Sequence, residues 1–445
     1  MSPSAVVVAD PRQLTTTNGY PTTAASGKTV VANQIKAAAV TTALALDPNP
    51  VSNDDVGNPA QHKYGRYRNP SLYVTPDHDV RVEESPIPPP SPTEVLIHVR
   101  ATGICGSDLH LWHRGAIGPL TVDHAHILGH EASGVVLETG SAVGHLKPGD
   151  RVAIEPQLPC HTCFLCTSGK YNLCESVRFL GVCNGGTIRR FMTHEARYCH
   201  KIPDAMTFVQ GALLEPLSVN LHAIRQCGGS VSIGKPVLIC GAGPIGLIAL
   251  ASVRASGAWP IVITDIEESR LDFARKFVPG VKTYLVRQQH QQPSKTALEC
   301  AEEIRLLFGC SGTRDVERGI PEENEYNAPS TVMECTGIES SVITAAYACR
   351  RSGIVMVIGV GRSLMDRLPF MHLSLAEIQL RFMNRYNDTW PAGINALSDK
   401  HVLDLDALVT HKFPLERATE AMKLCADRSQ SSIKVMIVDD QEILP

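Results

Sequence analysis

The chain has 445 residues, of which 43% are hydrophobic and 19% charged, and its formal net charge is -4. That composition can build roughly two or three domains of about 150 residues each. The charges are evenly spread and no apolar run reaches the ~18 residues of a membrane span, so we expect no nucleic-acid partner and no membrane partner.

The first 65 residues are rich in Ala, Thr, Val, Pro and Asn and show no sustained periodicity. This composition predicts a mostly disordered extension over residues 1–65, with ordered structure from about Tyr64. The extension lacks the basic-then-apolar pattern of a secretory signal, and only Arg12, Lys28 and Lys36 are basic before residue 60. We therefore expect a cytoplasmic protein, with a mitochondrial presequence as the weaker alternative.

Residues 66–220 alternate short β-type runs with Gly and Pro, which is typical of an irregular all-β domain. Strands are expected at 71–80 and 94–101, separated by a Pro-rich turn at 86–90. This part of the chain is predicted to fold as one β domain.

Four cysteines in this β domain form a C-x2-C-x2-C-x7-C pattern, and they crowd into fifteen residues. Four thiolates at this spacing can surround one tetrahedral zinc ion and leave no open position, so the predicted site is structural. Bacterial ferredoxins use a similar start for an iron–sulfur cluster, but their last spacing is shorter. Disulfide pairing is the other alternative, although the clustering favours a metal in a reducing compartment. The predicted ligands are Cys160, Cys163, Cys166 and Cys174.

The pattern changes near Glu215, after which apolar strands alternate with helices. This alternation predicts an α/β fold, a doubly wound parallel sheet over residues 221–384. Its strands are expected at 236–240, 261–265, 331–335 and 354–359, and its helices at 243–257 and 298–308.

Two further segments are expected around and after this sheet. A polar loop at 310–330 is predicted to be a surface insertion. Residues 385–445 carry one or two helices and a final strand at 432–438, and they are predicted to return to the first domain.

A glycine-rich turn, GAGPIG at 241–246, follows the first parallel strand and opens the next helix. The first glycine permits a tight turn, the second lets the backbone approach a pyrophosphate, and the third lets the helix pack on the strand. Asp265 ends the next strand, where a carboxylate binds the ribose and repels a 2′-phosphate, so NAD is expected rather than NADP. The alternative is a glycine turn without a ligand. The expected coenzyme contacts are Gly241, Gly243, Pro244, Ile245, Gly246, Asp265 and Arg270, the last packing on the adenosine.

A second set of possible metal ligands is scattered along the chain. Cys105 lies in GICGSD, His130 and Glu131 in GHE, and Glu215 in EPLSV. Ligands this far apart cannot be deduced from spacing, and a lone histidine is more often a hydrogen-bonded structural residue than a ligand. From the patterns alone, none of the four residues can be assigned as a metal ligand.

From about residue 66 to its end, the chain resembles the medium-chain zinc-dependent dehydrogenases. Within them it resembles the polyol branch of sorbitol and xylitol dehydrogenases, and most of all the fungal L-arabinitol 4-dehydrogenases. The resemblance is carried by TGICGSDLHLW (102–112), ILGHEASG (127–134), LLEPLSV (213–219), CGAGPIG (240–246) and NRYNDTWP (384–391), together with KYNLC (170–174), ECTG (334–337) and VTHKFPLE (409–416).

The resemblance implies a GroES-like catalytic domain at 66–220, a Rossmann coenzyme domain at 221–384, and a homotetramer. It implies that Cys105, His130 and Glu215 bind a catalytic zinc, with Glu131 beside the metal or bridging through water. Such a set leaves a fourth position for water or substrate. Together with the four-cysteine site, this gives two zinc ions per chain. The resemblance further implies that Asp108 orients His130 and that Ser107 and His110 relay a proton.

The resemblance also implies a substrate pocket and the far end of the coenzyme site. Leu111 and Phe179 are expected to line the pocket, Arg385 and Tyr386 to face both substrate and nicotinamide, and Val360 to contact the coenzyme. The sequence departs from the polyol branch in three respects, one of which is that the 1–65 extension and the 310–330 insertion have no counterpart there. Residues 180–187 read LGVCNGGT where relatives carry a Thr-Pro-Pro turn, and Leu111 replaces an aromatic residue.

The predicted function is therefore a zinc-dependent oxidoreductase that transfers hydride from a secondary hydroxyl of a sugar alcohol to NAD and gives a ketose. The altered 180–187 loop motivates a second hypothesis, a dehydrogenase of a less polar secondary alcohol in a specialised pathway. A third is a catalytically silent nucleotide-binding protein, which would be expected to lack the metal ligands that this chain retains.

Overall fold

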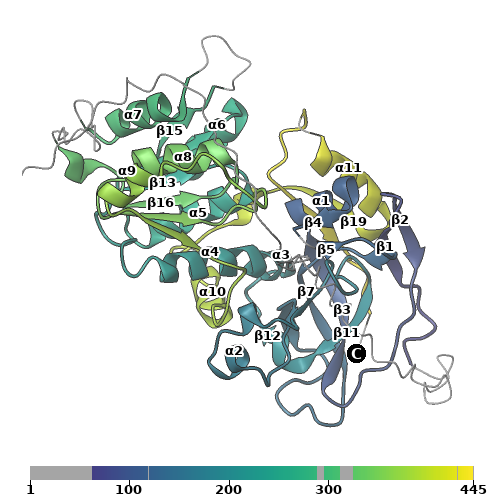
Figure 1. Ribbon diagram of the computed structural model, residues 1–445. Coiled ribbons are helices and arrows are strands. Elements are labelled where there is room, and N and C mark those ends of the chain that lie inside the picture. The colour runs from purple at the N-terminus through teal and green to yellow at the C-terminus, as the bar shows by residue number, and fades with distance from the viewer. Residues whose placement is uncertain (1–62, 119, 288–294, 311–323, 428, 444–445) are drawn as a thin grey trace, which may run out of the picture. The chain divides into compact units, whose positions relative to one another are not determined.

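The computed structural model describes residues 63–118, 120–287, 295–310, 324–427 and 429–443, all within one compact unit (Figure 1). Most of the predicted extension and most of the predicted 310–330 insertion lie outside these residues. Near the start of the described part, Tyr64 is fully buried, and its ring lies 6.3 Å from that of Phe191. Packing against the β-rich half of the molecule is thus already present at Tyr64.

A seven-stranded sheet with the long strand β3 at its centre forms the β-rich half (Figure 1). The strand order is β12-β8-β7-β3-β20-β19, and β11 also pairs with β3. Nearly every residue of β3 is buried, because other elements cover both of its faces. The strands are β3 (Glu94–Gly103), β7 (Glu131–Thr139), β8 (Arg151–Ile154), β11 (Phe191–Glu195), β12 (Cys199–Lys201), β19 (Val409–Pro414) and β20 (Lys434–Val438).

The first ordered strands form a hairpin. β1 (Pro70–Val74) and β2 (Val80–Glu84) pair antiparallel, and the chain reverses between Thr75 and Asp79. The prediction of one strand over 71–80 is therefore wrong. The reversal needs a residue with positive φ, supplied by His78 at 61°. Pro76 and Asp77 beside it are common turn residues.

The second sheet has six parallel strands in the order β15-β14-β13-β16-β17-β18. The four strands predicted from apolar runs are present and occupy the middle of this sheet. The two edge strands, β15 and β18, were not predicted, because an edge strand is half-exposed and has no continuous apolar run. The strands are β13 (Val237–Cys240), β14 (Ile261–Asp265), β15 (Lys282–Leu285), β16 (Thr331–Glu334), β17 (Ile354–Val357) and β18 (Gln379–Phe382).

Helices connect the parallel strands and cover the sheet (Figure 1). The chain order reverses between β13 and β16, and in doubly wound sheets ligands bind at the carboxyl ends of the strands at this point. These helices are α5 (Pro244–Ala255), α6 (Glu268–Phe277), α7 (Ala297–Leu307), α8 (Glu339–Ala348) and α9 (Phe370–Leu375). Two further helices flank the sheet in sequence: α4 (Leu214–Gln226) precedes β13 and packs against α5, and α10 (Trp390–Leu397) follows β18 and packs against α4.

After the parallel sheet the chain rejoins the first one. The final strand β20 pairs antiparallel with β3, with Ile437 opposite Thr102, and parallel with β19. Helix α11 (Ala418–Ala426) connects these last two strands. Across the described ranges, no helix combines the length and the apolar character needed to cross a membrane.

Candidate functional site

The register of β3 against β7 brings two distant sequence motifs together. Gly103, the last residue of β3, lies opposite Glu131, the first residue of β7. Cys105 follows β3 at the start of α1 (Gly106–Arg114), and His130 immediately precedes β7. As a result, the ligand atoms of Cys105, His130 and Glu131 all lie within 4.8 Å of one another. One cation can be bound by all three.

A buried carboxylate braces the two turns that carry these side chains. Asp108 accepts hydrogen bonds from the backbone N–H of Cys105 at 2.9 Å and from that of Gly129 at 3.2 Å. Its Oδ1 lies 3.7 Å from Nδ1 of His130, while the other ring nitrogen, Nε2, lies 3.3 Å from the Ser107 hydroxyl. Burial raises the pKa of Asp108. Asp108 therefore fixes the two turns, and it faces the nitrogen of His130 that points away from Ser107.

Glu131 has a partner that the sequence patterns did not identify. Its carboxylate forms an ion pair with Nζ of Lys434 on β20, and both side chains are 2% exposed. Lys434 also donates to the carbonyl oxygen of Ile104 at 3.0 Å. A lysine inside the otherwise apolar strand KVMIV is the signal that could have revealed it, since lysine is almost never buried without a partner.

Glu215 lies in the same neighbourhood but outside the three-residue group. It is buried in the first turn of α4. Burial raises the pKa of its carboxyl group to about 7, His130 opposes this shift, and Glu131 adds to it. The half-buried thiol of Cys105 and the buried carboxyl groups of Glu131 and Glu215 are near a single lysine, Lys434, so a divalent cation suits this donor set.

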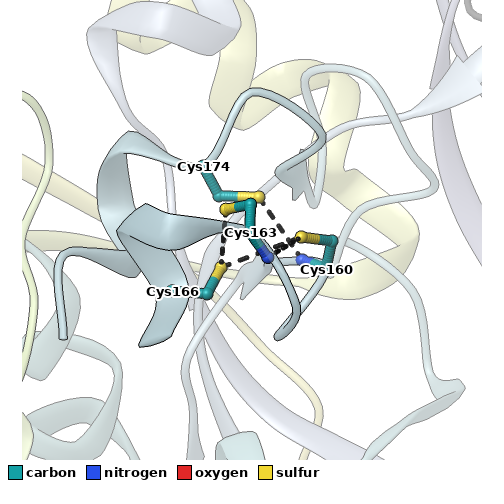
Figure 2. A group of neighbouring side chains, drawn as sticks. All are labelled: Cys160, Cys163, Cys166 and Cys174. Carbon is teal, nitrogen blue, oxygen red and sulfur yellow. Dashed lines mark hydrogen bonds between the residues drawn. The ribbon is translucent and has the colours of Figure 1, made fainter. Parts of the chain in front are cut away.

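The four predicted cysteines meet in one loop around α2 (Phe164–Thr167) (Figure 2). The Sγ–Sγ distance is 3.5 Å for Cys163–Cys166 and 3.9 Å for Cys160–Cys166. A regular tetrahedron with zinc–sulfur bonds of about 2.3 Å has edges of about 3.8 Å, so the thiols fit a closed zinc site. These separations exceed the ~2.05 Å of a disulfide bond, and Cys160, Cys163, Cys166 and Cys174 are all free thiols.

The glycine turn joins β13 to α5 in a tight loop. Gly241 has a positive φ of 99°, and a Cβ on Gly246 would lie 1.8 Å from the Gly241 carbonyl oxygen. Gly243 precedes Pro244, the first residue of α5. Asp265 accepts hydrogen bonds from the backbone N–H of Ala242 at 2.7 Å and of Glu267 at 2.9 Å. The carboxylate therefore stabilises the turn itself.

The other predicted coenzyme residues differ in their contacts and in their exposure. A Cβ on Gly243 would meet only the Arg270 guanidinium, at 3.8 Å. Arg270 and Ile266 also line a cavity of about 270 Å³ beside residues 430–433. Val360, 64% exposed, lies just beyond β17, and Ile245 is half-buried in the first turn of α5.

Two of the predicted pocket residues lie next to the metal-ligand group. The Phe179 ring is 5.3 Å from the His130 ring, and the Arg385 guanidinium is 4.3 Å from the centre of the Phe179 ring. Leu111 and Tyr386 are instead fully buried, so neither offers an exposed surface in this structure.

His110 lies on α1 one turn beyond Ser107 and is half-buried. Burial lowers the pKa of its imidazole, and Arg114 and His113 contribute to the same shift. The ring is therefore favoured in its neutral form, which can both accept and donate a proton.

The divergent 180–187 loop lies directly against the turn that carries His130. A Cβ on Gly181 would lie 2.4 Å from the carbonyl oxygen of Gly129, and one on Gly186 would lie 2.2 Å from that of Leu128. Only glycine allows this approach of backbone to backbone. Gly181 and Gly186 are therefore required by the contact of this loop with the His130 turn.

Comparisons with known proteins agree with this architecture. Two family models match: the alcohol dehydrogenase GroES-like domain over residues 91–204 and the zinc-binding dehydrogenase over residues 244–399. The L-arabinitol 4-dehydrogenase of Aspergillus oryzae is 46% identical over 386 residues, which cover 84% of this chain and 96% of that protein. The sorbitol dehydrogenase of Macaca fascicularis is 41% identical over 357 residues, which cover 80% and 92%.

A solved structure agrees as well. L-idonate 5-dehydrogenase of Escherichia coli matches with a TM-score of 0.70 at 28% identity, over 84% of this chain and 98% of that chain. With the family matches, this confirms the predicted fold class, a GroES-like β domain combined with a parallel Rossmann sheet.

Proposed function

Because this chain belongs to the medium-chain zinc-dependent alcohol dehydrogenase family, we propose that it oxidises a secondary hydroxyl group of a sugar alcohol, with NAD as the hydride acceptor. L-Arabinitol, xylitol and sorbitol are the substrates proposed, and a ketose and NADH are the products. The observation that carries the proposal is the convergence of Cys105, His130 and Glu131 within 4.8 Å in a chain this similar to polyol dehydrogenases.

The proposal assigns two zinc ions to each chain. Cys105, His130 and Glu215 would bind the catalytic ion, with Glu131 beside it, and the four-cysteine loop would bind the structural ion. A zinc ion bound by the first set would supply a Lewis acid that lowers the pKa of the substrate hydroxyl. The Ser107 hydroxyl would accept the released proton and pass its own towards His110, and its position 3.3 Å from a ring nitrogen of His130 supports this role.

The coenzyme assignment rests on the turn between β13 and α5. The amino end of α5 favours the pyrophosphate, and Asp265 favours an unphosphorylated ribose. Arg385 and Val360 would border the nicotinamide end. The protein's contribution to hydride transfer is to align the carbinol carbon with the nicotinamide and to exclude water.

The proposed substrate class is tested with a panel of alcohols on the purified protein with NAD or NADP. L-Arabinitol, xylitol and sorbitol should be turned over with a higher kcat/KM than simple secondary alcohols, and NAD should be the better acceptor. The glycine loop at 180–187 favours the second candidate, a less polar secondary alcohol. No polyol turnover at millimolar substrate, together with turnover of apolar alcohols, would select that candidate.

Changing Asp265 to serine together with Ile266 to arginine should raise the ratio of kcat/KM for NADP to that for NAD by about ten- to a hundredfold. The double change removes the repulsion of a 2′-phosphate and adds a charge-assisted hydrogen bond worth about 1.5–3 kcal/mol. Ile266 is 42% exposed, so an arginine can be accommodated. Steady-state rates with both coenzymes measure the ratio, and Asp272→Ser on α6 is the matched control. An unchanged ratio would mean that Asp265 does not determine the choice between NAD and NADP.

We also propose a cytoplasmic homotetramer in which residues 66–220 and 385–445 form the catalytic domain and 221–384 the coenzyme domain. The oligomeric state is measured by light scattering, with an expected mass of four chains of 48.1 kDa.

A further inference from the structure

The segment between β18 and α10 has an unusual backbone. It contains Arg385 and Asp388, whose φ angles are 54° and 47°. This left-handed region is unfavourable for residues with a side chain, and it persists where the surroundings hold it in place. Strained backbone of this kind is concentrated at functional sites. The contacts that hold residues 384–388 in this conformation therefore indicate how the segment is used.

The four-cysteine loop supplies several of these contacts. Asn172 donates to the carbonyl oxygen of Asn384 at 2.8 Å, and Asn384 donates back to that of Asn172 at 3.4 Å. The backbone N–H of Asp388 donates to the Tyr171 hydroxyl at 3.0 Å. Asn387 donates to the carbonyl oxygen of Gly169 at 2.6 Å. Tyr171 and Asn172 lie just before Cys174, the last of the four cysteines.

Tyr171 is itself held in position. Its hydroxyl donates to Oε1 of the buried Glu155 at 2.8 Å, while the other oxygen of Glu155 pairs with Nε2 of His200 at 2.7 Å. The His200 ring stacks on the Trp390 ring at 5.0 Å, with an angle of 7° between the planes. Glu155 therefore holds the Tyr171 hydroxyl in place on the loop side. Trp390, which follows the segment, is connected to the same carboxylate through His200.

A second clamp comes from α4, the helix that carries Glu215. Arg225 donates to the carbonyl oxygen of Asn387 at 2.5 Å and to that of Asp388 at 3.1 Å. The segment 384–388 is thus bonded to the four-cysteine loop and to the helix of a proposed zinc ligand.

The segment carries Arg385, which lies in the proposed active site. Arg385 lies over the Phe179 ring, which in turn lies beside His130. Tyr386, next in sequence, is fully buried. A shift of the backbone at 384–388 would move the Arg385 guanidinium away from Phe179.

We propose that Tyr171 and Asn172 are positioning residues through which the four-cysteine loop sets the orientation of Arg385 in the substrate pocket. The inference rests on the proposed function for the role of Arg385, but the mechanical link between loop and segment does not. The closed metal site would then do more than stabilise its own loop, because it would also fix part of the pocket.

The test uses Tyr171→Phe and Asn172→Asp in the full chain with its zinc bound. Each change removes a bond to the segment while keeping the size of the side chain. We expect hydrogen exchange at the amides of Arg385 and Tyr386 to quicken at least about tenfold. KM for the polyol should rise about tenfold with kcat changed less than about twofold, because lost substrate positioning acts on binding. The Kd for NADH and a content of two zinc ions per chain should not change.

Tyr326→Phe, at a tyrosine that is 71% exposed, is the matched control and should behave as the unaltered protein. Unchanged exchange at Arg385 and Tyr386 would overturn the link between loop and segment. Faster exchange with an unchanged KM would overturn the role in the substrate pocket, as would loss of a zinc ion in either variant. If the unaltered protein turned over no polyol, the proposed function would fail, while the exchange measurement would still decide the link.

Discussion

Replacing Cys105 with alanine should lower kcat/KM for the polyol by about a thousandfold or more and reduce the zinc content from two ions per chain to one. Without its thiolate, the proposed catalytic site keeps only His130 and carboxylates to bind the metal. Loss of the Lewis acid removes several kcal/mol of transition-state stabilisation, and about 4 kcal/mol corresponds to a factor of a thousand in rate. Zinc is measured by elemental analysis and turnover with saturating NAD.

A matched control separates this effect from the general loss of a cysteine. Cys300 is buried in α7 and belongs to neither cysteine-containing group, so Cys300→Ala should keep two zinc ions and nearly full turnover. The Cys105 variant should also retain its Kd for NADH, because the glycine turn is untouched. If Cys105→Ala kept two zinc ions and its activity, the assignment of the catalytic site would be wrong.

Replacing Lys434 with methionine should lower the free energy of unfolding by about 3–5 kcal/mol, the range for a buried ion pair that loses one partner. The methionine fills a similar volume but leaves Glu131 as a buried carboxylate without its lysine. The Ile104 carbonyl oxygen would lose its hydrogen bond from Lys434 as well. Urea unfolding of the metal-free protein measures the change without a contribution from bound zinc.

The double variant Lys434→Met with Glu131→Gln should recover a large part of this loss, because it removes the uncompensated charge. Glu131→Gln alone should also destabilise the protein, since it leaves Lys434 without its carboxylate. Recovery in the double variant is the sign of direct coupling between the two side chains. A loss of less than about 1 kcal/mol in Lys434→Met would mean that water or another group satisfies Glu131.

The sequence predicted the middle of the parallel sheet well and its edges poorly. Strands such as β13, with every residue buried, are continuous apolar runs that stand out from their surroundings. The edge strands KTYL and QLRF are half-exposed, so their composition resembles that of a loop. The turn between β1 and β2 was also missed. It occupies only Thr75–Asp79, and the residues on both sides of it have the composition of one continuous strand.

Two parts of the candidate site could be specified from the sequence because they are local. The four cysteines span fifteen residues, and the glycine turn spans six, so chain geometry restricts how far apart their atoms can lie. In these two segments, the spacing of the residues is enough to predict the site. Four closely spaced thiols can form a closed metal site, and glycines stand where a side chain would clash with the backbone.

The meeting of Cys105 with His130, the pairing of Glu131 with Lys434, and the clamping of residues 384–388 were decided by the tertiary fold. These groups lie tens to hundreds of residues apart, and no spacing rule relates them. Cys105 and His130 meet because β3 and β7 pair with Gly103 opposite Glu131, and Lys434 reaches Glu131 because β20 joins the same sheet. Strand register, set by the packing of whole sheets, is a property of the assembled core and cannot be inferred from any one segment.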